Sequence, residues 1–143
     1  MVEAREEHLE DLVELALDLW PEAGEDDLRQ TYADLLRSDR HKVLLFAAQD
    51  RYVAFIHLAI RTDYVEGSDS SPTGFVEGIY VKPDFRRKGI SRKLVDQGEQ
   101  WVRSMGCKQI GSDIYLDNRT SYDFHLSVGF KEAGRLIHFI KDL

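Results

Sequence analysis

The residues best suited to chemistry gather in one basic stretch, Val81-Lys82-Pro83-Asp84-Phe85-Arg86-Arg87-Lys88-Gly89-Ile90-Ser91-Arg92. An apolar, strand-like run ends at Val81, and an amphipathic helical pattern begins at Ile90. Backbone N–H groups at a helix N-terminus are unpaired, and the helix dipole favours negative charge there. Gly89 lets the backbone approach an anion closely, and the three basic side chains before it add positive charge. The stretch predicts a phosphate-binding loop.

This loop has neither the P-loop pattern G-x-x-x-x-G-K-[ST] nor the dinucleotide pattern G-x-G-x-x-G. Two other interpretations of a basic cluster stay open, a solvated surface and a nucleic-acid patch. The formal net charge of -7 argues against nucleic acid as the main partner, because phosphate binding needs a dominant positive field. The same charge suits a cationic small molecule, although acidic composition also serves solubility alone.

Two acidic residues interrupt runs that otherwise have the character of strands. Glu77 alternates with Phe75, Ile79 and Val81, so we expect it on their face of the strand. A carboxylate is costly to bury, so it should meet a cation or water. It therefore meets either a bound cation or a basic residue of the chain. The same burial argument applies to Asp113 in the next strand-like run, which either meets a cation or water or accepts an N–H bond at a bulge.

The elements that must position these residues follow from the hydrophobic periodicity. Helical spacing predicts helices within residues 9–20, 28–36, 90–105 and 120–128. β-rich runs predict strands over 43–48, 52–60, 75–81 and 109–115, the first two forming a hairpin around Asp50-Arg51, whose turn type stays open. Two more short strands are expected between 130 and 143, around Gly134-Arg135. This order predicts an α+β fold with a mostly antiparallel sheet.

Length and composition fit one domain, residues 1–143, with one hydrophobic core: 43% of the residues are hydrophobic and 31% are charged. No apolar run is long enough to cross a bilayer, and the acidic N-terminus is not a secretory signal, so no membrane partner is expected. Cys107 is the lone cysteine, which favours a structural thiol and a cytoplasmic location. The histidines show no metal-binding spacing, so no metal is expected.

Arg86, Gly89 and Ser91 fall on the three fixed positions of the pattern [QR]-x-x-G-x-[GA]. The chain thereby resembles the GCN5-related N-acetyltransferases, although Ser91 departs from their usual Gly or Ala. Gly129-Phe130 stands where that family has a Gly-Phe pair, and Asn118 stands where it often has an asparagine near the pantetheine arm. The resemblance covers essentially the whole chain. It implies the family's acetyltransferase fold, a central sheet splayed in its middle and flanked by helices, and acetyl-CoA as the cosubstrate that enters at the splay.

A narrower resemblance, to the aminoglycoside 6′-N-acetyltransferases, is carried by three segments: Trp20-Pro21, the loop Asp63-Tyr64-Val65-x-Gly67-x-Asp69-Ser70-Ser71-Pro72, and Phe75-x-Glu77-Gly78-Ile79-x-Val81. It implies a polycationic acceptor amine, antibiotic resistance as the role, and a homodimer. Aromatic faces in such a cleft suit sugar rings and ammonium groups.

The resemblance also implies roles for single residues. Glu77 or Asp113 would act as the base, and His125 stands where the family often has a tyrosine that protonates the departing thiolate. Alternatively, no side-chain acid is used. The acceptor cleft would be lined by Trp20, Tyr64, Glu66, Asp69, Glu77 and Asp113, although Trp20 also suits a core and the two loop acids also suit solvent. Acetyl-CoA would contact Ile79, Tyr80, Val81, Arg86, Arg87, Lys88, Gly89, Ile90, Ser91, Arg92 and Asn118, with the strand backbone polarising the thioester carbonyl.

Two rival functions stay open. The first is the same enzyme class with another acceptor, such as a polyamine, a metabolite amine or a protein N-terminus. The acid-rich loop 63–69 favours a compact cation over a protein. The second is a non-catalytic binder of CoA or aminoglycoside, which the replacement of a tyrosine by His125 keeps open because side-chain acids often add large factors to a rate.

Overall fold

The computed structural model describes residues 1–143 and is built around one five-stranded sheet in the order β1-β2-β3-β4-β5. The first four strands are antiparallel neighbours, and β5 is parallel to β4. The predicted α+β fold with a mostly antiparallel sheet is therefore confirmed. The strands are β1 (Val2–Glu3), β2 (His41–Ala48), β3 (Arg51–Arg61), β4 (Thr73–Val81) and β5 (Ile110–Ser112).

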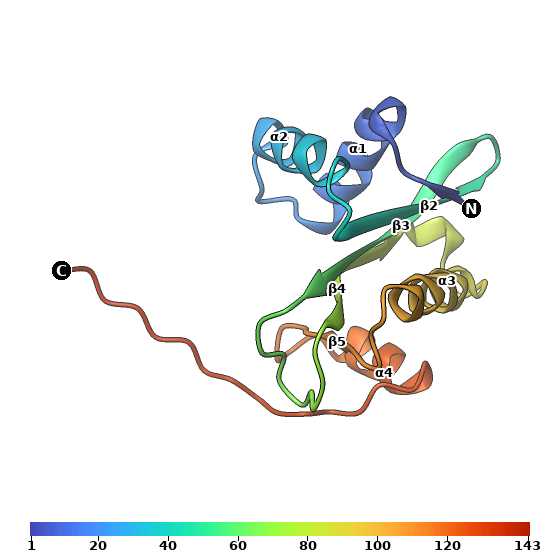
Figure 1. Ribbon diagram of the computed structural model, residues 1–143. Helices are drawn as coiled ribbons and strands as arrows, with labels where there is room; N and C mark the ends of the chain where they lie inside the picture. Colours follow the sequence, from blue (N-terminus) through green and yellow to red (C-terminus); the bar gives the residue numbers. More distant parts are fainter.

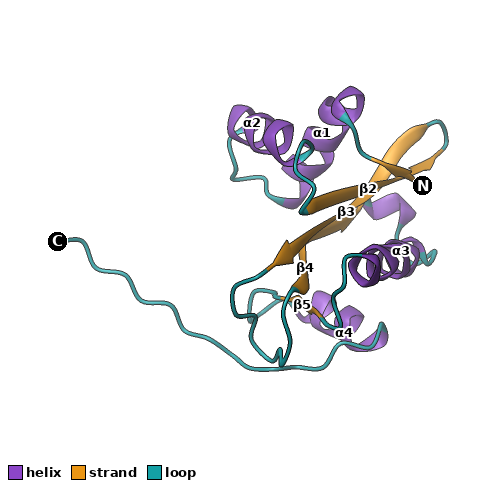
Figure 2. Ribbon diagram, viewed as in Figure 1, coloured by secondary structure: helices purple, strands orange, loops and turns teal.

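Helices cover both faces of the sheet (Figures 1 and 2). On one face lie α1 (Leu9–Leu19), preceded by the short 3-10 helix Glu6–His8, and α2 (Glu25–Leu35). On the other lie α3 (Ile90–Ser104), preceded by the 3-10 turn Pro83–Phe85, and α4 (Arg119–Ser127). The four predicted helices are thus present. None of them combines the length and the apolar character needed to span a membrane.

Each face of the sheet has its own hydrophobic core. Beneath α3, the cluster includes Ile56, Leu58 and Leu94, all fully buried. Beneath α1 and α2, it includes Tyr32 and Phe55. Neighbouring β3 residues therefore point into different cores, as the period of a strand requires. This alternation makes β3 apolar almost throughout, because both of its faces are covered.

The turn that joins β2 to β3 lies at Gln49-Asp50, one residue before the predicted break. Both residues have positive φ, 52° and 60°, which is the backbone of a type I′ turn. This turn matches the right-handed twist of a two-stranded hairpin, so it pairs the strands directly. The predicted hairpin is confirmed, and its turn type is now defined.

The sheet splays where β4 and β5 part. The two strands pair only from Gly74↔Ile110 to Val76↔Ser112, whereas β4 continues to Val81. The splay expected from the resemblance is therefore present. The strand predicted over 109–115 was too long, because after Ser112 the chain has no neighbouring strand with which to pair.

A β-bulge lies at the same place in β4. Val76 is opposite Leu58 and Gly78 is opposite His57, which leaves Glu77 as an extra residue. A bulge of this kind shifts the alternation of side chains along the strand. Ile79 and Val81 consequently pack in the core beneath α3, whereas the Glu77 side chain is bonded to Arg61, whose guanidinium lies over Phe75 on the other face. The expectation that Glu77 shares a face with Ile79 and Val81 was wrong for this reason.

Residues 130–143 form no helix or strand. Phe130 still packs on the core and Gly134 still lies beside Glu66, and the last part of the segment runs away from the body of the molecule (Figure 1). The two short strands predicted around Gly134-Arg135 are therefore absent. A strand needs a neighbour that accepts its backbone hydrogen bonds, and this segment leaves the sheet that would supply one. Large apolar side chains in it are exposed, including Phe139 at 91% and Ile140 at 98%.

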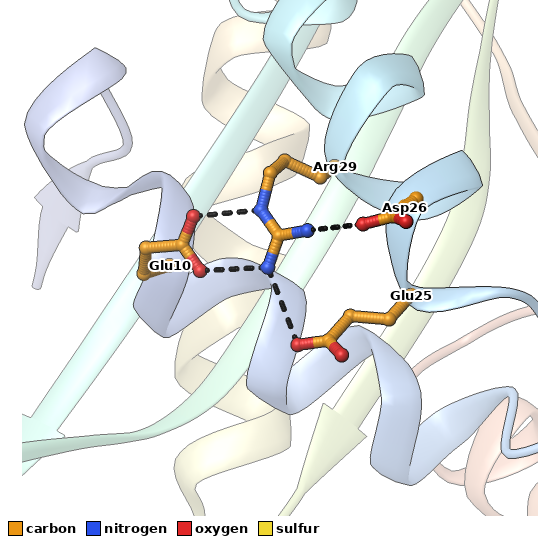
Figure 3. Close-up of polar contacts among 4 residues, drawn as sticks. All are labelled: Glu10, Glu25, Asp26 and Arg29. Atoms are coloured by element: carbon orange, nitrogen blue, oxygen red, sulfur yellow. Dashed lines mark hydrogen bonds and ion pairs between the residues drawn. The ribbon is translucent and has the colours of Figure 1, made fainter.

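One arginine joins the two helices on the α1 and α2 face (Figure 3). Arg29 of α2 binds Glu10 of α1 through two hydrogen bonds, Nε–Oε1 at 2.8 Å and Nη2–Oε2 at 3.0 Å. It also bonds to Asp26 at 2.8 Å and Glu25 at 3.2 Å within its own helix. The hydrogen bond to Arg29 lowers the pKa of Glu10. This network holds α2, which carries the buried Tyr32, against α1.

We predict that Arg29→Gln lowers the melting temperature near neutral pH, because three carboxylates lose their shared cation. A depressed pKa in the folded state contributes stability above the unfolded pKa, and this stability is lost as pH falls through the folded value. The difference from wild type should therefore shrink in acid, and also in about 1 M NaCl, which screens exposed charges. Calorimetry measures the melting temperature of each variant under these conditions. The control is Arg37→Gln, which removes only a 3.7 Å pair with Glu6. An equal loss in both variants would contradict the network.

Candidate active site

The basic loop and the start of α3 have the geometry expected of an anion site. Gly89 is the N-cap of α3 with φ of 79°, and a Cβ built on it would meet no atom within 4 Å. The helix begins with the Lys93 N–H donating to the Gly89 carbonyl at 3.1 Å. The N–H groups of the turn before Lys93 consequently have no acceptor inside the helix and point outward. Open space at a glycine and free N–H groups are what a phosphate needs.

Two arginines of this stretch also have structural contacts. Arg86 donates its Nε–H to the Val81 carbonyl at 2.8 Å, which ties the loop back to the end of β4. Arg92 donates from Nη2 to the Ser127 carbonyl at 3.2 Å, which joins the start of α3 to the end of α4. The loop is thus held beside the splay rather than free in solvent. Arg87 and Lys88 are exposed and complete its positive charge.

The open fork between β4 and β5 begins at two predicted site residues. Val76 and Ser112 are the last pair, so Glu77 and Asp113 are the next residues along the two parallel strands. Beyond them the β4 edge that faces β5 pairs with no strand, which includes the backbone of Ile79, Tyr80 and Val81. Unpaired backbone groups at such a fork can bond to an extended ligand instead.

Glu77 meets a cation of the chain itself. Arg61 binds it through Nη2–Oε1 at 2.8 Å, Nη2–Oε2 at 3.0 Å and Nε–Oε1 at 3.2 Å. The guanidinium also lies over the Phe75 ring, 3.6 Å from its centroid. Of the alternatives left open by the sequence, the ion pair is the one present. Sequence reasoning missed Arg61 because it placed that residue at the start of a loop, whereas it ends β3.

A hollow of about 500 Å³ opens over this ion pair. It contains two of the predicted acceptor residues, Tyr64 and Glu77, and it adds Asp63, Arg61 and His41. Tyr64 is 73% exposed and forms one wall. Arg40, Ala59, Ile60 and Thr62 complete the lining. The hollow combines two carboxylates, two arginines, an aromatic ring and an imidazole, which suits a polar ligand with charged groups and ring faces.

The other predicted acceptor residues, Trp20, Glu66, Asp69 and Asp113, do not line this hollow. Trp20 is half-buried, with its ring 6.2 Å from that of Phe55, and a Cβ on Gly78 would come within 2.6 Å of it. Trp20 therefore covers β4 on the α1 side. Glu66 and Asp69 are exposed in the loop before β4, and Asp69 donates its N–H to Gln109 Oε1 at 2.9 Å. The structure thus brings Tyr64 and Glu77 together in one lining, of which Glu66 and Asp69 are not part.

His125 and Asn118 both hold α4 in place. His125 Nδ1 lies 2.7 Å from the Ser121 carbonyl, and its Nε2 lies 2.7 Å from Ser112 Oγ. A carbonyl only accepts, so Nδ1 carries a proton, and Nε2 of the neutral ring accepts from the Ser112 hydroxyl. Asn118 caps α4, its side chain accepting the Ser121 N–H at 3.1 Å. The roles predicted for them toward thiolate and pantetheine stay predictions. No group of three His, Cys, Asp or Glu residues is placed to hold a metal ion.

Comparison with known protein families gives a clear result. The model of the acetyltransferase (GNAT) family matches residues 9–130. An aminoglycoside N(6′)-acetyltransferase type 1 of Acinetobacter genomosp. 13 is 38% identical over 125 residues, which are 87% of this chain and 86% of that protein. One of Acinetobacter haemolyticus is 36% identical over 98% of this chain and 96% of the relative.

Solved structures agree with these relatives. The aminoglycoside acetyltransferase AAC(6′)-Iy, in complex with the bisubstrate analogue CoA-S-monomethyl-acetylneamine, superposes with a TM-score of 0.94 at 32% identity. That match covers 99% of this chain and 97% of that one. The apo structure of the 6′-N-acetyltransferase AAC(6′)-IG of Acinetobacter haemolyticus also superposes with a TM-score of 0.94, at 36% identity and the same coverage.

We predict that Gly89→Ala weakens CoA binding by about tenfold or more, because the methyl group enters the space beside the free N–H groups. Isothermal titration calorimetry measures this affinity. Gly106→Ala is a matched control, since Gly106 follows the other end of α3 with φ of 84° and equally open space. Both variants should lose about 1 kcal/mol of stability from left-handed backbone strain, whereas only the first should lose CoA affinity. Equal CoA affinities would refute the anion site.

Proposed function

The chain belongs to the acetyltransferase (GNAT) family, and we propose that it transfers the acetyl group of acetyl-CoA to the 6′-amine of aminoglycosides, conferring antibiotic resistance. One observation carries the choice of acceptor. The hollow beside the splay of β4 and β5 has Glu77, Asp63 and Tyr64 in its wall, so it offers carboxylates and an aromatic face to a polycationic amine. Relatives 34–38% identical over most of the chain carry that activity in their names.

Acetyl-CoA would reach the fork from the α3 side. Its pyrophosphate would lie on the N–H groups that follow Gly89, and the pantetheine arm would run along the unpaired edge of β4. Ser91 is half-buried and small, so it fits the place where the family usually has Gly or Ala. The thioester carbonyl would then meet the N–H groups of residues 79–81, which stabilise the negative charge that develops on its oxygen.

The two carboxylates at the fork suit different tasks. Asp113 is exposed and forms no ion pair in the chain, so it is free to take the proton from the acceptor ammonium. Glu77 is held by Arg61, so it suits the anchoring of a substrate ammonium beside that pair. The uncharged amine then attacks the thioester carbonyl carbon, the C–N bond forms, the C–S bond breaks and CoA leaves as thiolate or thiol. No covalent acyl-enzyme is required.

The principal alternative is the same transfer to another amine. A polyamine such as spermine carries the same charges without rings or hydroxyls, and a protein N-terminus needs an open groove. The exposed Tyr64 beside Asp63 and Glu77 favours a compact acceptor with ring faces. A non-catalytic binder is distinguished by CoA binding without thiol release.

Free-thiol release from acetyl-CoA, measured with kanamycin, tobramycin, a 6′-hydroxy aminoglycoside and spermine, tests the proposal. We expect turnover with the two 6′-amino compounds only, because the reaction needs an amine at that position. Turnover with spermine alone would transfer the assignment to polyamines. Silence with all four, despite CoA binding, would remove the aminoglycoside function.

We predict that Asp113→Asn lowers kcat by about 10²- to 10⁴-fold, as expected for loss of a general base. Glu77→Gln should mainly raise the KM for the aminoglycoside, because it removes an ammonium anchor. The controls are Asp96→Asn and Glu99→Gln on α3, which make the same chemical changes away from the hollow. Steady-state kinetics against both substrates separates the change in kcat from the change in each KM. The opposite pattern, with kcat lost in Glu77→Gln only, would exchange the two roles.

We also propose that the protein is a homodimer and that it acts in the cytoplasm, where a lone buried thiol such as Cys107 stays reduced. Residues 131–143 support the dimer. They are exposed throughout and carry five large apolar side chains: Leu136, Ile137, Phe139, Ile140 and Leu143. Such a patch on a single chain calls for a partner, and a second copy offers the same segment in return.

Size-exclusion chromatography with light scattering tests the dimer. The wild-type protein should have twice the chain mass of 16.5 kDa, whereas Phe139→Asp with Ile140→Asp should shift it toward monomer, because charge opposes burial of the segment. Lys141→Asp and Asp142→Lys together form a control that leaves the apolar residues in place. A monomeric wild type would contradict the proposal.

A further inference from the structure

A row of three polar side chains, two of them buried, leads from the core beneath α2 to the hollow. Tyr32 of α2 is 2% exposed, and His57 of β3 is 5% exposed. Tyr32 Oη lies 3.3 Å from His57 Nδ1, and His57 Nε2 lies 3.0 Å from His41 Nδ1. His41, at the start of β2, is half-buried and lines the hollow. The row therefore ends with the His41 ring at the wall of the proposed acceptor site.

Hydrogen bonding fixes the proton positions along this row. The Tyr32 hydroxyl has one partner, His57 Nδ1, and a buried O–H must donate, so that nitrogen accepts. His57 consequently carries its proton on Nε2 and donates to His41 Nδ1. Neutral His41 must then carry its proton on Nε2, the nitrogen that bonds to no other group of the chain. The row presents an N–H donor to the hollow.

The same row opposes a positive charge on His41. A proton on His41 Nδ1 would face the proton on His57 Nε2, and reversing the row would leave the buried Tyr32 O–H without an acceptor. Burial lowers the pKa of His57 to about 4, and burial also lowers the pKa of His41, although the nearby Glu77 carboxylate acts in the other direction. The other charged or titratable groups around His41 in the hollow are Arg40, Arg61, Asp63 and Tyr64.

We propose that His41 is a specificity-determining residue that donates its Nε2–H to a hydroxyl of the acceptor, and that Tyr32 and His57 position it and keep it neutral. The proposal rests on the proposed function and names the part of the substrate that this wall recognises. Carboxylates such as Glu77 bind ammonium groups and do not distinguish an aminoglycoside from a polyamine. A neutral donor does, because sugar rings carry hydroxyl oxygens and polyamines carry none.

Two substitutions at His41 test the hydrogen bond. His41→Leu removes the donor, and His41→Gln keeps an N–H near the position of Nε2. We expect His41→Leu to raise the KM for kanamycin B by about 3- to 10-fold, the loss of one neutral hydrogen bond, with kcat and the KM for acetyl-CoA unchanged. His41→Gln should restore most of the affinity. Against the 3′-deoxy and 3′,4′-dideoxy analogues of kanamycin B, the His41→Leu penalty should disappear for the acceptor that lacks the contacted hydroxyl.

A constant penalty across these acceptors, or an equal rise in the KM for acetyl-CoA, would show that His41 only supports the fold, and would overturn the proposal. An unchanged KM in His41→Leu would overturn it as well. If the wild type turns over no aminoglycoside, the proposed function is wrong. That result says nothing about the hydrogen bonds among Tyr32, His57 and His41, which are tested separately.

Imidazole ¹H–¹⁵N correlation spectra test the row without any turnover. His41 and His57 should both be neutral and protonated on Nε2 near neutral pH. Tyr32→Phe keeps the ring but removes the donor, so His57 should lose its tautomer preference in that variant. A His41 ring protonated on Nδ1, or charged at neutral pH, would overturn the positioning role. This readout also decides the matter if His41→Leu fails to fold.

Discussion

The point on which the site depends is the end of pairing between β4 and β5 after Val76. The bulge at Glu77 lies immediately beyond it, so two consequences come from one place in the chain. The backbone of residues 77–81 has a free edge for an extended ligand, and the Glu77 side chain turns toward the α1 and α2 face while Ile79 stays in the other core. One local irregularity therefore separates the two proposed ligand sites across a single strand.

Charge balance is the second constraint on the acceptor side. A half-buried carboxylate needs a compensating cation, and Arg61 supplies it to Glu77 while resting on Phe75. A further cation at His41 would weaken the attraction of the hollow for an ammonium group. The buried row behind His41 opposes that charge, because its hydrogen bonds are complete only when both imidazoles are neutral. A histidine can thus serve the proposed acceptor site as a hydrogen-bond donor without adding charge.

The helices, the hairpin and the start of α3 at Gly89 were predictable because each has a local signal: apolar spacing of 3.6 or 2, and a glycine at the start of an amphipathic run. The bulge was not, since it depends on how β4 pairs with β3, and no residue type marks it. The same is true of Arg61 and of the His57 to His41 contact. With the Gln49-Asp50 turn in place, the hairpin register puts Val43 opposite His57 and Ala59 opposite His41, so the two histidines become diagonal neighbours.

The C-terminal segment shows the opposite failure of a local signal, which is a predicted element that is absent from the structure. Its run Leu136-Ile137-His138-Phe139-Ile140 has the composition of a strand, and the prediction of strands there followed that composition. β-propensity describes how side chains pack on a half-buried, paired surface, and a single chain that leaves its sheet provides none. Apolar side chains that lie this close together on an exposed surface favour association with another molecule. The segment therefore has the composition of a strand but forms none, and both facts are explained if the surface on which it packs belongs to another molecule.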